Sequence, residues 1–338
     1  MLRKWPVWLL SPLLAVLVAG SANTNAEPAD GEFLRWNVPA DKADCPVGDT
    51  AVWSNYRGGR DCIRYFSAGE IENAPEAMVV FYGDRVLWAE RELSKIPRNT
   101  VREQRAYVAG LSARFGMPVI LIARPGTFGS SGNHYRRRQV AEFLALDDAL
   151  DEIREQHRIG RFILVGQSGG ATAVGALLTL GRADVSCAVM TSGAFALVER
   201  AEFIRKRNGR RSWPGRDTTG LRDSYDPLAH VTGIATDPAR QILVIGSPED
   251  RSTPFQFQKR FADAIAARGH NVRLVEHEAP PPTHHALAGV GLEFASRCAA
   301  NGNHGGASGA GPPTRSSPKS APSSPQSPLE HHLSGSTK

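Results

Sequence analysis

A serine between glycines is the first feature of this sequence that could do chemistry. Residues 166–170 read Gly-Gln-Ser-Gly-Gly with Ser168 at the centre, directly after an apolar run that ends at Val165. A strand, a sharp turn and a helix in that order lift a serine hydroxyl clear of a sheet, and glycines on either side leave room for the turn. A phosphate-binding turn would need a following lysine, and none is present. The pattern predicts that Ser168 is a nucleophile.

A serine hydroxyl becomes nucleophilic when a base takes its proton and an acid orients that base. Both residue types follow Ser168 along the chain. Glu249 and Asp250 lie in a loop after a predicted strand, and His284 and His285 lie after the last predicted strand. Acyl transfer also needs donors for the developing oxyanion, and the N–H of Gly169 is the natural first one.

The elements that would position these residues alternate between strand and helix. Predicted strands cover 77–82, 119–123, 162–165, 185–190, 242–245 and 272–275, and predicted helices cover 100–115, 137–157, 169–180, 255–268 and 287–298. This alternation is typical of an α/β protein with a mostly parallel sheet and helices on both faces. A hairpin of strands at 49–55 and 61–67 brings the total to eight strands. Residues 195–237 exceed a normal crossover, and we interpret them as a lid excursion over the sheet.

Together these motifs resemble the α/β-hydrolase fold family of serine hydrolases over residues 49–298, on its dienelactone-hydrolase and prolyl-oligopeptidase side. The family has the same chain order of nucleophile, acid and histidine. The resemblance implies Asp250 as the acid, because residues 250–254 match the family's D-x-x-V-P-like loop. It implies His284 as the base, with His285 as the alternate. It also implies that the Asp84 N–H is the second oxyanion donor, although Tyr82 stands where relatives carry histidine.

The function that this resemblance implies is that of an exported serine hydrolase with an acyl-enzyme on Ser168. The expected substrate is a small-molecule ester or a short peptide, with ester favoured, and no cofactor or metal is expected. An acyltransferase and a non-catalytic exported binding module on the same fold are the alternatives. Residues 199–222 hold eight arginines and lysines against three acidic residues. They form either a positive lid that favours acidic substrates or a solvated face.

The two ends of the chain differ from the middle. Residues 1–26 place Arg3 and Lys4 before a short apolar stretch broken by prolines, which is typical of a cleaved secretory signal. They predict a periplasmic or secreted protein with no membrane span after cleavage. Residues 299–338 are rich in Gly, Ser and Pro, and we predict a disordered tail. The hydrolase-like domain is then 27–298.

Composition excludes several classes of protein. The 338 residues are 41% hydrophobic and 22% charged, which is usual for a globular chain and excludes disorder throughout and a multi-pass membrane protein. A net charge of +6 is too small to indicate nucleic-acid binding, and nothing indicates an oligomeric state.

The four cysteines lie in the part of the chain that we expect to be exported, where disulfides form. The hairpin favours a Cys45–Cys62 bridge, and Cys187 then pairs with Cys298 or both remain thiols. The sequence has no C-x-x-C or H-E-x-x-H spacing, which argues against a zinc site.

Overall fold

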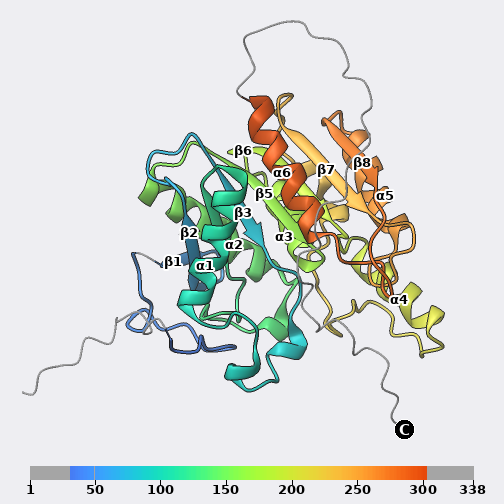
Figure 1. The fold of residues 1–338 in the computed structure, drawn as a ribbon. Coiled ribbons are helices and arrows are strands. Elements are labelled where there is room, and N and C mark those ends of the chain that lie inside the picture. Colours follow the sequence, from blue (N-terminus) through green and yellow to red (C-terminus); the bar gives the residue numbers. More distant parts are fainter. Residues whose placement is uncertain (1–30, 49, 303–338) are drawn as a thin grey trace, which may run out of the picture. The chain divides into compact units, whose positions relative to one another are not determined.

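The computed structural model of this protein describes residues 31–48 and 50–302 (Figure 1). The predicted signal at 1–26 lies outside these residues, as does the predicted tail beyond Gly302. Within the described ranges, none of the helices combines the length and the apolar character that crossing a bilayer requires.

All eight predicted strands are present and form one open sheet in the order β1-β2-β4-β3-β5-β6-β7-β8. The pairs β1–β2 and β2–β4 are antiparallel, and every other neighbouring pair is parallel. The strands are β1 (Ala51–Tyr56), β2 (Gly59–Ala68), β3 (Glu76–Phe81), β4 (Val119–Ile122), β5 (Arg161–Gln167), β6 (Val185–Thr191), β7 (Gln241–Gly246) and β8 (Val272–Glu276). The carboxyl ends of parallel strands meet at one edge, so the loops after β3, β5, β7 and β8 gather there.

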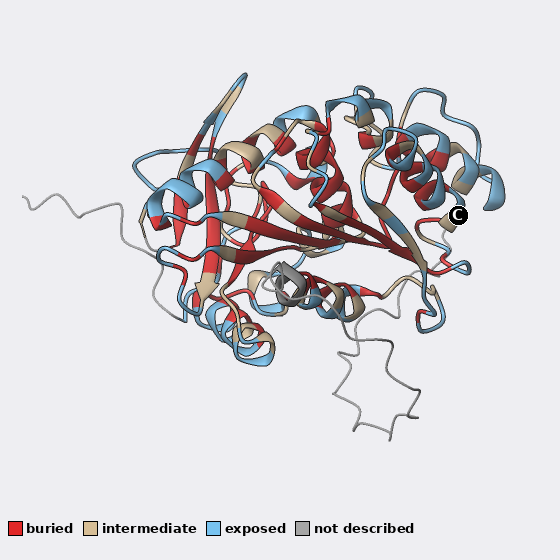
Figure 2. Cartoon of the chain, turned by 90° about the horizontal axis from the view of Figure 1, so that it is seen from above, coloured by how far each residue is buried: buried red, intermediate tan, exposed pale blue. Residues whose placement is uncertain are grey.

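Helices cover both faces of the sheet, as Figure 2 shows from above. On one face lie α1 (Val101–Phe115) and α6 (Ala288–Gly302), which share a buried apolar cluster with the sheet. On the other lie α2 (Val140–His157), α3 (Gly169–Thr179) and α5 (Phe255–Ala266), which share a second cluster. The crossover helices therefore bury the sheet on both sides, as parallel strands require.

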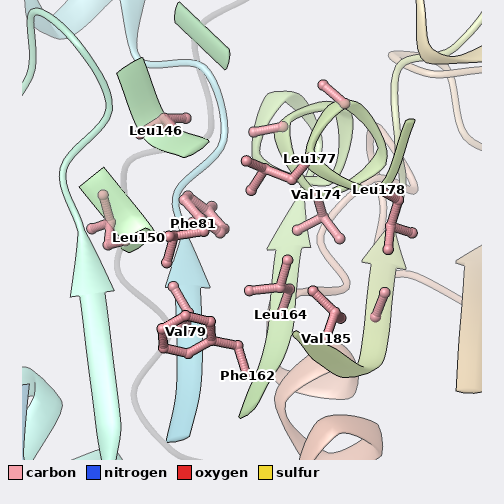
Figure 3. Close-up of a cluster of buried hydrophobic side chains, with 14 of the residues drawn as sticks. Val79, Phe81, Leu146, Leu150, Phe162, Leu164, Val174, Leu177, Leu178 and Val185 are labelled. Carbon is pink, nitrogen blue, oxygen red and sulfur yellow. The ribbon is translucent and has the colours of Figure 1, made fainter. Parts of the chain in front are cut away.

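The strand residues divide between the two clusters by alternation. In β3, Val79 and Phe81 belong to the cluster under α2 and α3, while Met78 and Val80 belong to the cluster under α1 and α6. Figure 3 shows part of the first cluster, with Val79 and Phe81 among residues from α2, α3 and β5. Each fully buried side chain of this size contributes about 1.5–3 kcal/mol, so the framework that carries the strand ends is rigid.

Both cysteine pairs form disulfides. The predicted Cys45–Cys62 bridge is confirmed, and of the two alternatives for Cys187 and Cys298, a bridge or two free thiols, the structure has the bridge. The first bridge ties the N-terminal segment to β2. The second ties β6 to α6, the helix that follows the histidine loop. Closing a loop with a disulfide restricts the unfolded chain and so stabilises the fold.

One helix start was predicted wrongly, and one helix was not predicted at all. The helix predicted from residue 137 begins at Val140, since Arg138 adopts a positive φ of 66° and its N–H donates to the Glu142 carboxylate. The excursion at 195–237 contains an unpredicted helix, α4 (Leu197–Arg207), and a 3₁₀ segment, Pro227–Gly233. The Asp226 carboxylate accepts the Leu197 N–H at the start of α4 at 2.7 Å. A cap 29 residues away in sequence leaves no local helix signal.

Candidate active site

Ser168 occupies the sharp turn that the sequence predicts, between β5 and α3. Its backbone angles, φ 57° and ψ −120°, are strained for a residue with a side chain. A Cβ at Gly166 would lie 2.3 Å from the Gly170 carbonyl oxygen, and one at Gly170 would lie 2.2 Å from the Phe81 carbonyl oxygen. Only glycine fits at either position, so the flanking glycines allow the chain to turn tightly enough to present Ser168.

The loop after β3 lies directly against this turn. A Cβ at Gly83 would lie 3.2 Å from the Ser168 Cβ, and a Cβ at Gly169 would lie 1.9 Å from Asp84 Oδ1. Among the described residues, no protein acceptor pairs with the N–H of Asp84 or of Gly169. The loop that carries Asp84 and the start of α3 at Gly169 therefore lie beside Ser168, with both N–H groups available.

A buried histidine supports the loop after β3. The Arg85 N–H donates to His134 Nε2 at 3.1 Å. Burial, aided by Arg124, lowers the pKa of His134 to about 3. The ring therefore stays neutral, and Nε2 remains an acceptor that holds the loop in place.

The Asp84 carboxylate is surrounded by arginines. It pairs with Arg124 at 2.9 Å, with Arg137 at 3.1 Å and with Arg138. Burial alone would raise the pKa of Asp84, but these guanidinium groups outweigh it and hold the pKa well below the usual range. Asp84 is therefore ionised, and its carboxylate is engaged by three guanidinium groups.

Asp250, the predicted acid, is buried in the loop after β7. Its side chain is fully inaccessible. Its Oδ1 accepts the N–H groups of Ser252 and Thr253, each at 2.8 Å. Its Oδ2 lies 2.9 Å from His285 Nδ1. With the Thr253 hydroxyl, which donates to Oδ2 at 2.8 Å, four contacts fix the carboxylate, and the histidine contact uses the oxygen that the backbone N–H groups leave available.

The histidine pair separates in the structure. His285 Nδ1 faces Asp250, whereas His284 Nδ1 lies 2.9 Å from the Ala279 carbonyl oxygen and 3.1 Å from the exposed Glu249 carboxylate. Since a carboxylate only accepts, the contact favours the tautomer that carries its proton on Nδ1 and leaves the lone pair on Nε2. The sequence analysis preferred His284. The structure instead brings the alternate, His285, to the predicted acid.

The comparisons with known proteins agree with this architecture. No protein-family model and no curated protein sequence matches the chain. The structure is similar to an esterase of Pyrococcus furiosus, with 14% identity and a TM-score of 0.51 over 80% of this chain and 97% of the esterase. It is also similar to Est1E from Butyrivibrio proteoclasticus, solved with ferulic acid bound, with 12% identity and a TM-score of 0.51 over 74% and 98% of the two chains. The chain has the α/β-hydrolase fold.

Two further side chains, to which the sequence assigns no role in the site, link its parts. The Gln167 side chain donates to the His285 carbonyl oxygen at 2.9 Å, joining the histidine loop to the turn before Ser168. Thr253 Oγ1 lies 2.8 Å from Asp250 Oδ2 and 3.3 Å from His285 Nδ1. Gln167 adjoins Ser168 in sequence, which is the only signal that marks it, and Thr253 stands at the apolar position of the loop pattern that the sequence resembles.

In the excursion at 195–237, several arginine side chains are paired with acceptors of the protein, so fewer of its positive charges are available than the sequence indicates. The Arg205 guanidinium pairs with Glu202 at 2.6 Å and donates to the Asp217 carbonyl oxygen at 2.7 Å. Arg216 donates to the Gly220 carbonyl oxygen. Arg200 is 3% exposed and donates to the Ser252 carbonyl oxygen and to Thr218 Oγ1, each at 3.0 Å. Several arginines of the predicted positive lid therefore hold the excursion together.

Proposed function

We propose that this protein is a serine hydrolase that cleaves carboxylic esters through an acyl-enzyme on Ser168. The observation that carries the proposal is the Asp250–His285 pair at 2.9 Å, tied by Gln167 to the turn that presents the serine. The α/β-hydrolase fold of the esterases named above supports it. Asp250 and His285 take the roles of acid and base, so His285 replaces His284 in our assignment.

In the proposed reaction, His285 Nε2 takes the Ser168 proton as Oγ attacks the ester carbonyl carbon. The N–H groups of Gly169 and Asp84 stabilise the oxyanion, and the loss of one such donor typically costs about 3 kcal/mol. Asp250 stabilises the imidazolium that forms. The imidazolium then protonates the departing alkoxide, and water, activated by the same base, releases the acid.

We also propose that the protein is exported. Its two disulfides, Cys45–Cys62 and Cys187–Cys298, are the kind of bridge that persists in an oxidising compartment. The N-terminal sequence supports a cleaved signal. Comparing the N-terminal residue and the mass of the protein recovered from cells and from the medium tests this directly.

A fluorophosphonate probe tests the nucleophile. We expect a covalent adduct on Ser168, located by peptide mass spectrometry, and no adduct with Ser168→Ala. Thr172, which lies one helical turn further along α3, offers a control, because Thr172→Ser keeps a hydroxyl there and should leave the adduct on Ser168. No adduct on the folded, oxidised protein would contradict the proposal and favour the binding-module alternative.

A further inference from the structure

A hollow of about 910 Å³ lies between α4 and the segment 210–221 and is called here the α4 hollow. Apolar side chains, among them Ile204, Trp213 and Leu221, form much of its wall. The remaining wall includes arginines and hydroxyl groups, and none of the described residues that line it is acidic. The hollow therefore combines an apolar surface with positive charge.

The positive charge in the hollow is only partly compensated. Arg205 is paired with Glu202. Arg210 and Arg211 are exposed and have no acidic partner among the described residues. Trp213 is 50% exposed and lies under the guanidinium of Arg216 at 4.7 Å. Unpaired guanidinium groups beside a half-exposed aromatic ring suit an anion with an apolar body.

The inner wall of the hollow leads to the catalytic residues. Thr218 lines the hollow, and its hydroxyl accepts from Arg138 at 2.6 Å and from Arg200 at 3.0 Å. Arg138 also pairs with the Asp84 carboxylate, which lies against Gly169. Arg200 also donates to the Ser252 carbonyl oxygen, in the loop after β7 that carries Asp250. One layer of side chains thus connects the hollow to both flanks of Ser168.

Arg200 adds a buried cation to this layer, and among the described residues it forms no direct ion pair, although the carboxylates of Asp84, Asp217 and Asp226 act on it from a distance. Its side-chain partners are a carbonyl and a hydroxyl, and its buried Nε has no partner in the described part of the chain. Burial and the neighbouring Arg138 lower the pKa of Arg200 to about 9, so the guanidinium is still charged at neutral pH. A buried guanidinium whose hydrogen bonds go only to neutral oxygens is costly, and a bound anion would add to the partial compensation that the three more distant carboxylates provide.

We infer that the α4 hollow binds the anionic end of the ester substrate, a carboxylate on an apolar chain or ring, while the ester group lies at Ser168. This inference rests on the proposed function and names its substrate class. Arg210 and Arg211 bind the carboxylate, the Trp213 ring contacts the apolar body, and Arg200 keeps the inner wall positive.

Matched substrates test the inference in the wild-type protein. One series pairs monoethyl esters of dicarboxylic acids of five to ten carbons with ethyl esters of monocarboxylic acids of equal length. The other pairs acetate esters of ω-hydroxy acids with acetates of the corresponding alcohols. We expect kcat/KM for the anionic member to exceed that of the neutral member by about 10-fold at the best length, and 0.5 M salt to reduce this preference. Equal or lower values for the anionic members of both series would overturn the inference.

Variants locate the preference. The double variant Arg210→Ser/Arg211→Ser should lose most of the preference and retain hydrolysis of the neutral esters. The control, Arg57→Ser/Lys206→Ser, removes the same charge from the hairpin turn and the solvent face of α4, where both residues are exposed. It should keep the preference. Because all four side chains are exposed, these changes should leave the fold intact. An equal loss in both double variants would overturn the assignment to the hollow.

Failure of the inference is distinguishable from failure of the proposed function. If the Ser168 adduct forms and neutral esters are hydrolysed without an anionic preference, the inference is wrong and the proposed function stands. If no adduct forms, calorimetry with Ser168→Ala still tests the hollow, using octanoate and octanol as probes. Binding of octanoate that weakens about 10-fold with Arg210→Ser/Arg211→Ser supports the hollow, and no binding of octanoate overturns it.

Discussion

Two neighbouring acid–histidine pairs, built from consecutive residues, have opposite environments. The Asp250–His285 pair is buried on its acid side, with a fully inaccessible carboxylate and two backbone N–H donors. The Glu249–His284 pair joins a carboxylate that is 72% exposed to a histidine that also contacts a backbone carbonyl. Residue type and spacing do not separate the two pairs. Burial and supporting hydrogen bonds do.

This contrast explains why we assign catalysis to only one pair. A base must be held in one orientation and one tautomer to take a proton at a fixed place. His285 is held by Asp250 through its ring and by Gln167 through its carbonyl. The Glu249–His284 contact involves a mostly exposed carboxylate, so water screens it and it gains little from its geometry.

Replacing each histidine by alanine in turn should produce the largest difference in kcat between the two pairs. We expect His285→Ala to lower kcat for a neutral ethyl ester by about 10⁵-fold, because Ser168 then has no base. His284→Ala should change kcat by less than about threefold. The rate of fluorophosphonate adduct formation should follow the same order. A large loss with His284→Ala in a folded protein would reverse the assignment.

Replacing Asp250, the acid of the buried pair, should also lower kcat, but by less than replacing His285. Asp250→Asn presents an amide N–H to His285 Nδ1, which favours the tautomer whose Nε2 is already protonated. We expect kcat to fall by about 10³- to 10⁴-fold with little change in KM. Circular dichroism and thermal unfolding check that the acid loop has not collapsed. An unchanged kcat would mean that another carboxylate serves His285.

Asp84 tests whether burial alone marks a catalytic carboxylate. It lies beside Gly169 and is paired with three arginines, yet no histidine contacts it among the described residues. Asp84→Asn keeps the backbone N–H that we propose as an oxyanion donor but removes the charge. We expect the free energy of unfolding to fall by about 3 kcal/mol, measured by urea denaturation. A protein as stable as the wild type would show that the arginines need no carboxylate.

The low pKa of Asp84 determines how the stability difference between the wild type and Asp84→Asn depends on pH. The arginines hold the pKa of Asp84 well below its usual range in the folded protein. Its contribution is therefore complete above the unfolded-state pKa of about 3.9 and is lost as the pH falls toward the folded-state value. The difference in unfolding free energy between wild type and Asp84→Asn should be constant from pH 5 to 8 and shrink below about pH 4. A difference that persists undiminished at pH 3 would contradict this explanation.

Much of the framework was predictable because its signals are local. Apolar runs and helical periodicity located eight strands and five helices, and the glycines around Ser168 marked the turn. The helix α4 was not predictable, since its N-terminal cap comes from Asp226, far along the chain. The start of α2 was misplaced because Arg137 and Arg138 turn toward Asp84 instead of continuing the helix.

The choice between His284 and His285 was the point at which sequence reasoning failed. Consecutive residues in a loop point in different directions, and that direction depends on backbone angles that the sequence does not reveal. His284 has a positive φ of 52°, which turns its ring toward Glu249. Only the burial of Asp250 and the contact from Gln167 identify the other ring as the one that faces the acid.

The smallest expected effect comes from the exposed acid. Glu249→Gln removes a charge from a pair that lies mostly in water, so kcat should stay within about twofold and the unfolding free energy within about 0.5 kcal/mol. Steady-state kinetics and urea denaturation at pH 7 measure both. A change in kcat of tenfold or more, with the unfolding free energy unchanged, would show that Glu249 acts on the site through His284. The two pairs would then be one network, and burial would no longer separate them.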